Sequence, residues 1–263
     1  MAAMNDAPAV EADASSMQGA AVFNHPDDHE FWCRIHPASP DSVPVNEDTK
    51  TFANLQAQLE QDFSQVPKLK RSIKFLKRCF KVPMGNEEAP VCVRSFINMT
   101  KWFGSFTRLT NNSCIFLDQI HKLMSYLLEQ GNEKISPFAG MIDQRQAEEH
   151  LNQPSAKPES YLIRFSESLA EQGGFSLAVK CNATEIRHYN ILGNTAEASQ
   201  QRTFNARLKL RHREYPDLNE DEGEYNDIVE FMKNRLSDEI EDNVYCTYIC
   251  PNLPCNALFR GYD

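Results

Sequence analysis

The 263-residue sequence lacks several features that would assign it to a common class of protein. It has no apolar run of about 18 residues, the length that a membrane-spanning helix needs, so we expect no membrane span. Its N-terminal segment lacks the basic and apolar regions of a signal peptide and has no glycine after Met1, so neither such a signal nor myristoylation is expected. A nucleophile elbow, a glycine-rich phosphate loop followed by Lys and Ser/Thr, and a paired-carboxylate signature are also missing. We therefore expect no catalytic residue, no enzymatic activity and no cofactor.

The cysteines and the charges narrow the class further. The eight cysteines are scattered through apolar patterns, which is typical of free thiols in a reducing compartment and favours a cytoplasmic location. The net charge of −10 argues against a dedicated nucleic-acid binder. Residues 151–213 nevertheless carry a net charge of +4. That local excess predicts an anionic ligand there.

Residues 1–50 are acidic and rich in Ala, Pro, Asp and Ser, which predicts a mostly disordered tail. Within it, four side chains fall on one face of a hypothetical helix and could ligate zinc: His25, His29, Cys33 and His36. The alternative is a short aromatic docking segment or a helix that is merely rich in histidine. We expect no metal.

A helical region is predicted over residues 51–137. Apolar residues recur at helical spacing from Phe52 to Phe63, behind Thr51 as a cap, and again from Pro67 to Val82. Further apolar stripes run over 96–106 and 116–128, with Gly131 as a stop. The helix over 67–82 has a basic outer face, which is either solvated or docks on an anionic membrane, calmodulin or an import receptor.

The nine residues 160–168, Ser-Tyr-Leu-Ile-Arg-Phe-Ser-Glu-Ser, are the most informative stretch of the chain. The apolar and aromatic residues predict a strand buried on both faces, with Arg164 in its middle. A charge there needs a partner, and the hydroxyls and turn amides of Ser166, Glu167 and Ser168 could hold a phosphate beside it. The alternative is an arginine at a strand edge that pairs with a surface carboxylate.

This stretch resembles the phosphate-binding strand and loop of an SH2 domain. Residues 138–151 resemble the entry turn and first helix of that fold, residues 173–179 and 186–191 its next two strands, and residues 225–232 its second helix. Within the class, "YLIRFSES…GGFSLAV" and the tail "YCTYICPNLPCNALFRGYD" are most similar to the STAT family. The preceding helices resemble the STAT linker domain. The resemblance implies an α+β fold, in which an all-α linker-type bundle precedes a central antiparallel sheet flanked by two helices, with the SH2 domain over 138–263.

The resemblance also implies site residues for a phosphotyrosine. Arg164 would make the main bidentate contact, and Ser166, Ser168 and the backbone of Glu167 would line the phosphate loop. His188 would lie against the phosphotyrosine ring. The first helix of the family usually supplies a second basic residue, but Gln144 occupies that position here, with Arg145 beside it. Either Arg145 turns inward, or the pocket has one charge fewer.

The peptide residues after the phosphotyrosine are expected to meet Tyr189. The alternative for His188 and Tyr189 is an ordinary pair of strand residues. Between residues 193 and 224 the connection is longer than usual in the family, and alternating apolar residues there predict an added strand: Phe204, Ala206, Leu208 and Leu210. Tyr225 follows an acidic run, which is either a solvated cap of the second helix or the setting of a phosphorylated tyrosine.

The expected function is therefore that of a non-catalytic phosphotyrosine-binding module in signalling, with tyrosine-phosphorylated proteins or peptides as partners. The alternatives are a Cbl-like adaptor, a truncated STAT-like competitor, and a pathogen effector that reads host phosphotyrosine after secretion into the host cell. A Cbl-like adaptor would need a zinc-binding RING, and its Cys/His spacing is missing. A complete STAT would need a coiled coil and a DNA-binding barrel, for which the chain has no room. A nuclear location and dimerisation stay open.

Overall fold

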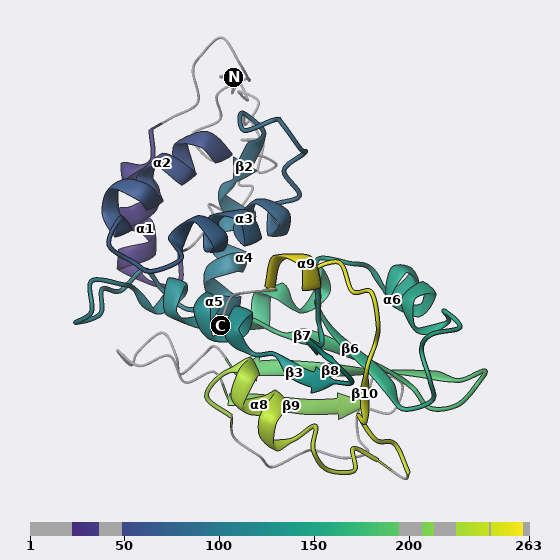
Figure 1. Ribbon diagram of the computed structural model, residues 1–263. Coiled ribbons are helices and arrows are strands. Elements are labelled where there is room, and N and C mark those ends of the chain that lie inside the picture. The colour runs from purple at the N-terminus through teal and green to yellow at the C-terminus, as the bar shows by residue number, and fades with distance from the viewer. Residues whose placement is uncertain (1–22, 37–48, 195–206, 213–224, 242, 260–263) are drawn as a thin grey trace, which may run out of the picture.

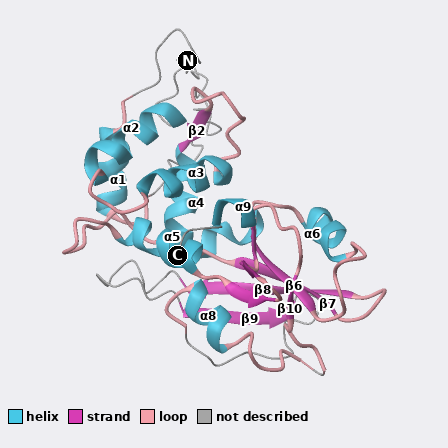
Figure 2. Cartoon of the chain, in the orientation of Figure 1, coloured by secondary structure: helices cyan, strands magenta, loops and turns pink. Residues whose placement is uncertain are grey.

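The computed structural model of the chain describes residues 23–36, 49–194, 207–212, 225–241 and 243–259. Its first half is mainly helical and its second half is built around a sheet, as Figures 1 and 2 show. The first half contains α1 (Pro26–Arg34), β1 (Thr49–Thr51), α2 (Phe52–Phe63), α3 (Leu69–Cys79), β2 (Pro90–Cys92), α4 (Val93–Phe103) and α5 (Ile115–Ser125). The second half contains β3 (Leu128–Gln130), β4 (Glu133–Ile135), β5 (Phe138–Gly140), α6 (Gln144–Leu151), β6 (Ser160–Phe165), the 3-10 helix η1 (Glu167–Gln172), β7 (Phe175–Lys180), β8 (Ile186–Asn194), β9 (Arg207–His212), α8 (Ile228–Asn234), β10 (Tyr248–Ile249) and α9 (Asn256–Phe259).

The sequence predicted an all-α region here, but the helical half also contains two short strands. Strands β1 and β2 form an antiparallel pair at its edge. Helix α2 begins where the sequence placed it, because the Thr51 hydroxyl accepts a hydrogen bond from the backbone N–H of Asn54 at 3.2 Å. The aromatic and aliphatic stripes of the helices turn inward and form a continuous core.

The predicted disordered tail is wrong for residues 23–36, which include helix α1. Phe31, Trp32 and Ile35 of this segment are buried, and Phe31 stacks on Phe106 with ring centroids 3.9 Å apart. The segment is thus a helix whose aromatic side chains pack into the core, which combines the two alternatives to a zinc site. Residues 1–22 and 37–48, the remainder of the predicted tail up to β1, lie outside the described residues.

Two predicted helix boundaries also differ. Helix α3 begins at Leu69 rather than Pro67, because Lys68 has a left-handed backbone with φ 58° that cannot continue a helix. Helix α5 ends at Ser125, so Leu128 belongs to strand β3 instead. Gly131, expected to stop that helix, has φ 66° in the turn between β3 and β4.

The main sheet is mixed rather than antiparallel, which corrects the predicted fold in part. Its antiparallel core runs in the order β6-β7-β8-β9, and the short strands β5 and β10 both pair with β6 in parallel. Strand β6 is therefore internal to the sheet, and all six of its residues are buried. The added strand predicted after β8 is present as β9, although Phe204 and Ala206 lie outside the described residues.

Helices cover both faces of this sheet. Helix α6, predicted over 143–152, packs beside β6 and β7. On the opposite face Phe165 meets helices α3 and α4, with its ring centroid 4.4 Å from that of Trp102. The indole N–H of Trp102 also donates to the carbonyl oxygen of Gly174 at 2.8 Å. The helical half and the sheet consequently share one hydrophobic core.

Two further expectations concern the described residues as a whole. None of the helices in the described ranges is long and apolar enough to cross a membrane. All eight cysteines fall within those ranges and are free thiols, as the sequence predicted.

Candidate functional site

Arg164 lies in the middle of β6 and is only 8% exposed. Its guanidinium donates hydrogen bonds to the carbonyl oxygens of Phe165 at 3.2 Å and Ile142 at 3.4 Å. The positive charge of Arg164 also acts on Glu148, whose pKa it helps to lower. A guanidinium held in this way retains the planar donor geometry that recognises carboxylates and phosphates.

Arg164 lines an open cavity of about 530 Å³ between the N-terminal end of α6, the end of β6 and the end of α3. A cavity of this volume is large enough for a small ligand group. Its lining residues are Lys81, Met141, Ile142, Asp143, Gln144, Gln146, Arg164, Phe165, Ser166, Glu167, Ser168, Ser176 and Asn190.

The sheet register adds two polar residues that the sequence interpretation missed. Ser176 of β7 lies opposite Arg164, and Asn190 of β8 lies opposite Ser176. Directly paired residues share a face of the sheet, so these three side chains form a polar row along the cavity wall. The signal was present in the sequence, because pairing the strand of Arg164 with the next predicted strand places a serine beside it.

Ser166 and Ser168 line the same cavity as Arg164. The Ser166 side chain is buried, and its hydroxyl lies 3.1 Å from the hydroxyl of Ser168. The Ser-Glu-Ser turn leads into the 3-10 helix η1, in which the backbone N–H of Leu169 bonds to the carbonyl oxygen of Ser166. Gly173 closes η1 with a left-handed backbone.

Helix α6 begins at the cavity with Asp143 as its cap, in a reciprocal capping box with Gln146. Gln144 lines the cavity and donates to Glu148 at 2.7 Å. The next residue, Arg145, is outside the lining set, and its 73% exposed side chain pairs with Glu149. The structure therefore brings Gln144, and not Arg145, to the cavity.

His188 lies next to the cavity rather than among its lining residues. Its Nε2 atom is 3.0 Å from Oε1 of Glu148, which links strand β8 to helix α6. The hydrogen bond from Gln144, followed by that from His188, holds the pKa of Glu148 below its ordinary value, against the opposing effect of burial.

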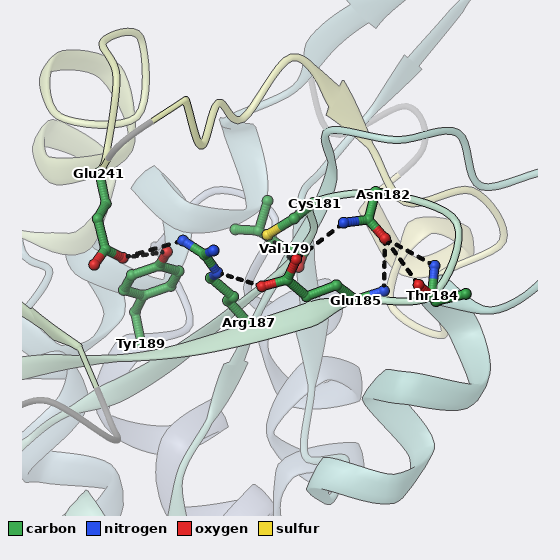
Figure 3. Close-up of polar contacts among 8 residues, drawn as sticks. All are labelled: Val179, Cys181, Asn182, Thr184, Glu185, Arg187, Tyr189 and Glu241. Carbon is green, nitrogen blue, oxygen red and sulfur yellow. Dashed lines mark hydrogen bonds and ion pairs between the residues drawn. The ribbon is translucent and has the colours of Figure 1, made fainter.

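Tyr189 faces the other side of the sheet, because it follows His188 in the strand alternation. It is 2% exposed, and its hydroxyl donates to Glu241 at 2.9 Å. Burial, with a smaller contribution from Glu241, raises its pKa well above the ordinary value. Figure 3 shows Tyr189 and Arg187 of β8 turned toward Glu241, and Arg187 also pairs with Glu185.

The residues suggested as zinc ligands do not gather. The imidazole of His25 caps α1, and His29 lies 3.5 Å from Cys33. Across the described part of the chain, no three His, Cys, Asp or Glu side chains form a group that could hold a metal ion.

Comparison with known protein families gives a match. Residues 138–210 match the family model for the SH2 domain, which covers the chain from β5 into β9. Among the curated proteins, no match to the chain is found. The chain thus contains an SH2 domain at residues 138–210, a class of module that binds phosphotyrosine peptides in signalling and is generally non-catalytic. The predicted SH2 resemblance is confirmed over this range.

Proposed function

We propose that the chain is a non-catalytic module that recruits, or docks on, tyrosine-phosphorylated proteins through the cavity around Arg164. The observation that carries this proposal is the buried guanidinium at the cavity wall, with Ser166 and Ser168 at the rim. A phosphate monoester carries about −1.5 to −2 charges at pH 7, so it would pair with that guanidinium at the cavity wall. Gln144 would add a neutral donor from α6.

The roles of the neighbouring residues follow from their positions. His188 would act beside the phosphotyrosine ring while it stays hydrogen-bonded to Glu148. Tyr189, buried on the opposite face, would hold β8 in place through its hydrogen bond to Glu241 instead of meeting the peptide residues after the phosphotyrosine. Arg145, which is paired with Glu149 outside the cavity, would make no contact with the phosphate.

We further infer a STAT-like arrangement, in which residues 51–137 serve as a linker-type helical region. This inference is supported by the way α3 and α4 pack on the sheet face away from the cavity. A chain of this kind would act as an adaptor or as a competitor of longer SH2 proteins. Its place of action would be the cytoplasm, where tyrosine-phosphorylated partners are found.

The test is a binding titration with fluorescently labelled, degenerate peptide pools centred on phosphotyrosine, phosphoserine or unmodified tyrosine. The full chain should bind only the phosphotyrosine pool. Arg164→Leu should weaken that binding about 30-fold to several thousand-fold, since losing one partner of a buried charge pair costs about 2–5 kcal/mol.

Circular dichroism and thermal unfolding should show that the Arg164→Leu chain remains folded. Arg145→Leu, which removes an exposed arginine on α6, is the matched control and should bind much as the wild type does. Binding that is equal for all three pools, or absent from all of them, would overturn the proposed function.

A further inference from the structure

The cavity around Arg164 receives a second cation from outside the SH2 domain. Lys81 lies two residues after Cys79, the last residue of α3 in the helical half, and it is among the cavity-lining residues. Its ammonium group lies 2.6 Å from Oε1 of Glu167, a residue of the phosphate loop. Residues 81 and 167 are thus brought together by the packing of α3 and α4 against the sheet.

The end of α3 holds Lys81 in a fixed place. The backbone N–H of Lys81 bonds to the carbonyl oxygen of Arg78, and that of Val82 bonds to the carbonyl oxygen of Lys77. These two bonds make a Schellman motif, in which the left-handed position is usually glycine. Lys81 occupies it with φ 54°. The backbone of Lys81 is therefore fixed at the helix end, and its side chain reaches Glu167 from there.

The charges around the cavity indicate what Lys81 contributes. Among the described residues, four charged ones line it: Arg164 and Lys81 are positive, and Asp143 and Glu167 are negative. Without Lys81, a phosphate dianion would enter a site in which carboxylates outnumber cations. The side chains of Lys81 and Glu167 are 61% and 68% exposed, and exposed ion pairs contribute little to stability. A phosphate can consequently take Lys81 from Glu167 at small cost.

We propose that Lys81 is the second phosphate-binding cation of this site, in place of the basic residue that Gln144 does not provide. The inference rests on the proposed function and deepens it. The ligand is a phosphate monoester on a tyrosine, bound by Arg164 from the sheet and by Lys81 from the helical half. The ion pair with Glu167 keeps Lys81 at the cavity until the ligand arrives.

The test uses Lys81→Gly in the full chain. Glycine suits the left-handed backbone, so this variant removes the cation while the helix end is preserved or stabilised. Lys68→Gly is the matched control, because Lys68 has the same residue type and a left-handed backbone with φ 58° at the other end of α3, and it does not line the cavity. The two lysines share the left-handed backbone and differ in their position relative to the cavity. A difference in binding between the two glycine variants would therefore report that position.

Binding of the phosphotyrosine peptide pool should weaken about fivefold to tenfold in Lys81→Gly, which corresponds to about 1–1.4 kcal/mol. Lys68→Gly should bind as the wild type does, and Lys81→Arg should restore most of the affinity because it keeps the charge. The difference between wild type and Lys81→Gly should shrink as salt is raised, since exposed charges are screened.

Failure of this inference can be separated from failure of the proposed function. If Lys81→Gly binds like the wild type while Arg164→Leu does not bind, Lys81 is no ligand and the phosphate site stands without it. If both glycine variants weaken binding equally, the effect is one of general charge and the inference is wrong. If the wild type binds no phosphotyrosine peptide, the proposed function itself is wrong.

Discussion

The buried carboxyl group of Asp28 makes a sharp prediction about stability and pH. Asp28 lies in helix α1, is 1% exposed, and accepts a hydrogen bond from the backbone N–H of Phe106 at 2.8 Å. Burial raises its pKa from 3.8 to about 7, although the hydrogen bonds from Phe106 and Thr100 act in the opposite direction. The folded protein therefore holds a proton on Asp28 at pH values where the unfolded chain has released it.

The sign of the effect follows from proton linkage. Between about pH 4 and pH 7 the folded state binds more protons at this position than the unfolded state, so the contribution of Asp28 to the free energy of unfolding falls as the pH rises. One pKa unit corresponds to about 1.36 kcal/mol, so a shift from 3.8 to about 7 amounts to about 4 kcal/mol over this window. Below pH 4 the raised pKa of Asp28 does not lower the free energy of unfolding, and above pH 7 the loss has reached its full size.

Asp28→Asn tests this directly, because an amide keeps the acceptor for the N–H of Phe106 and cannot ionise. Urea unfolding of the variant and the wild type should be compared at intervals from pH 4.5 to pH 8. The variant should become more stable relative to the wild type as the pH rises, by up to about 4 kcal/mol. Glu30→Gln, which removes an exposed carboxylate of the same helix, is the control for loss of charge. A wild-type minus Asp28→Asn difference that does not change with pH would refute the reasoning.

Two further predictions concern the shared core. Phe31→Ala should lower the free energy of unfolding by about 3–5 kcal/mol, because a fully buried ring stacked on Phe106 leaves a cavity; a loss below about 1 kcal/mol in chemical unfolding would contradict the packing of α1. Trp102→Phe should cost about 1–3 kcal/mol, since it keeps an aromatic ring but leaves the buried carbonyl oxygen of Gly174 without its donor. If chemical unfolding shows no loss for Trp102→Phe, that hydrogen bond does not stabilise the contact between the helical half and the sheet.

The strand that carries Arg164 could be predicted because its signal is local. Six consecutive residues with apolar neighbours define β6, and the serine-rich turn that follows lies at the same end of the strand. Ser176 and Asn190 needed one more step, the register of β7 and β8, which alternation and strand pairing could have supplied.

Other helices and strands could not be predicted from the sequence, because several structures share the same local sequence pattern. The apolar spacing over 116–128 fits a long helix as well as a helix followed by a hairpin, and only the turn at Gly131 distinguishes them. Helix α1 is short and lies within an acidic, alanine-rich segment, so composition outweighed the aromatic signal of Phe31 and Trp32. The parallel pairing of β5 and β10 depends on contacts between distant segments, which no local pattern encodes.

Lys81 is the clearest case of a site residue that sequence alone does not reveal. It is 83 residues from Arg164 in the chain, in a helix whose basic face suggested a solvated surface or a separate docking site. The helical half contacts both ends of η1, through the pair of Lys81 with Glu167 and through the hydrogen bond of Trp102 to Gly174, just after η1. Both contacts depend on α3 and α4 resting on the rings of β6. The cavity is therefore assembled by the shared core, and a family match over 138–210 covers only part of its wall.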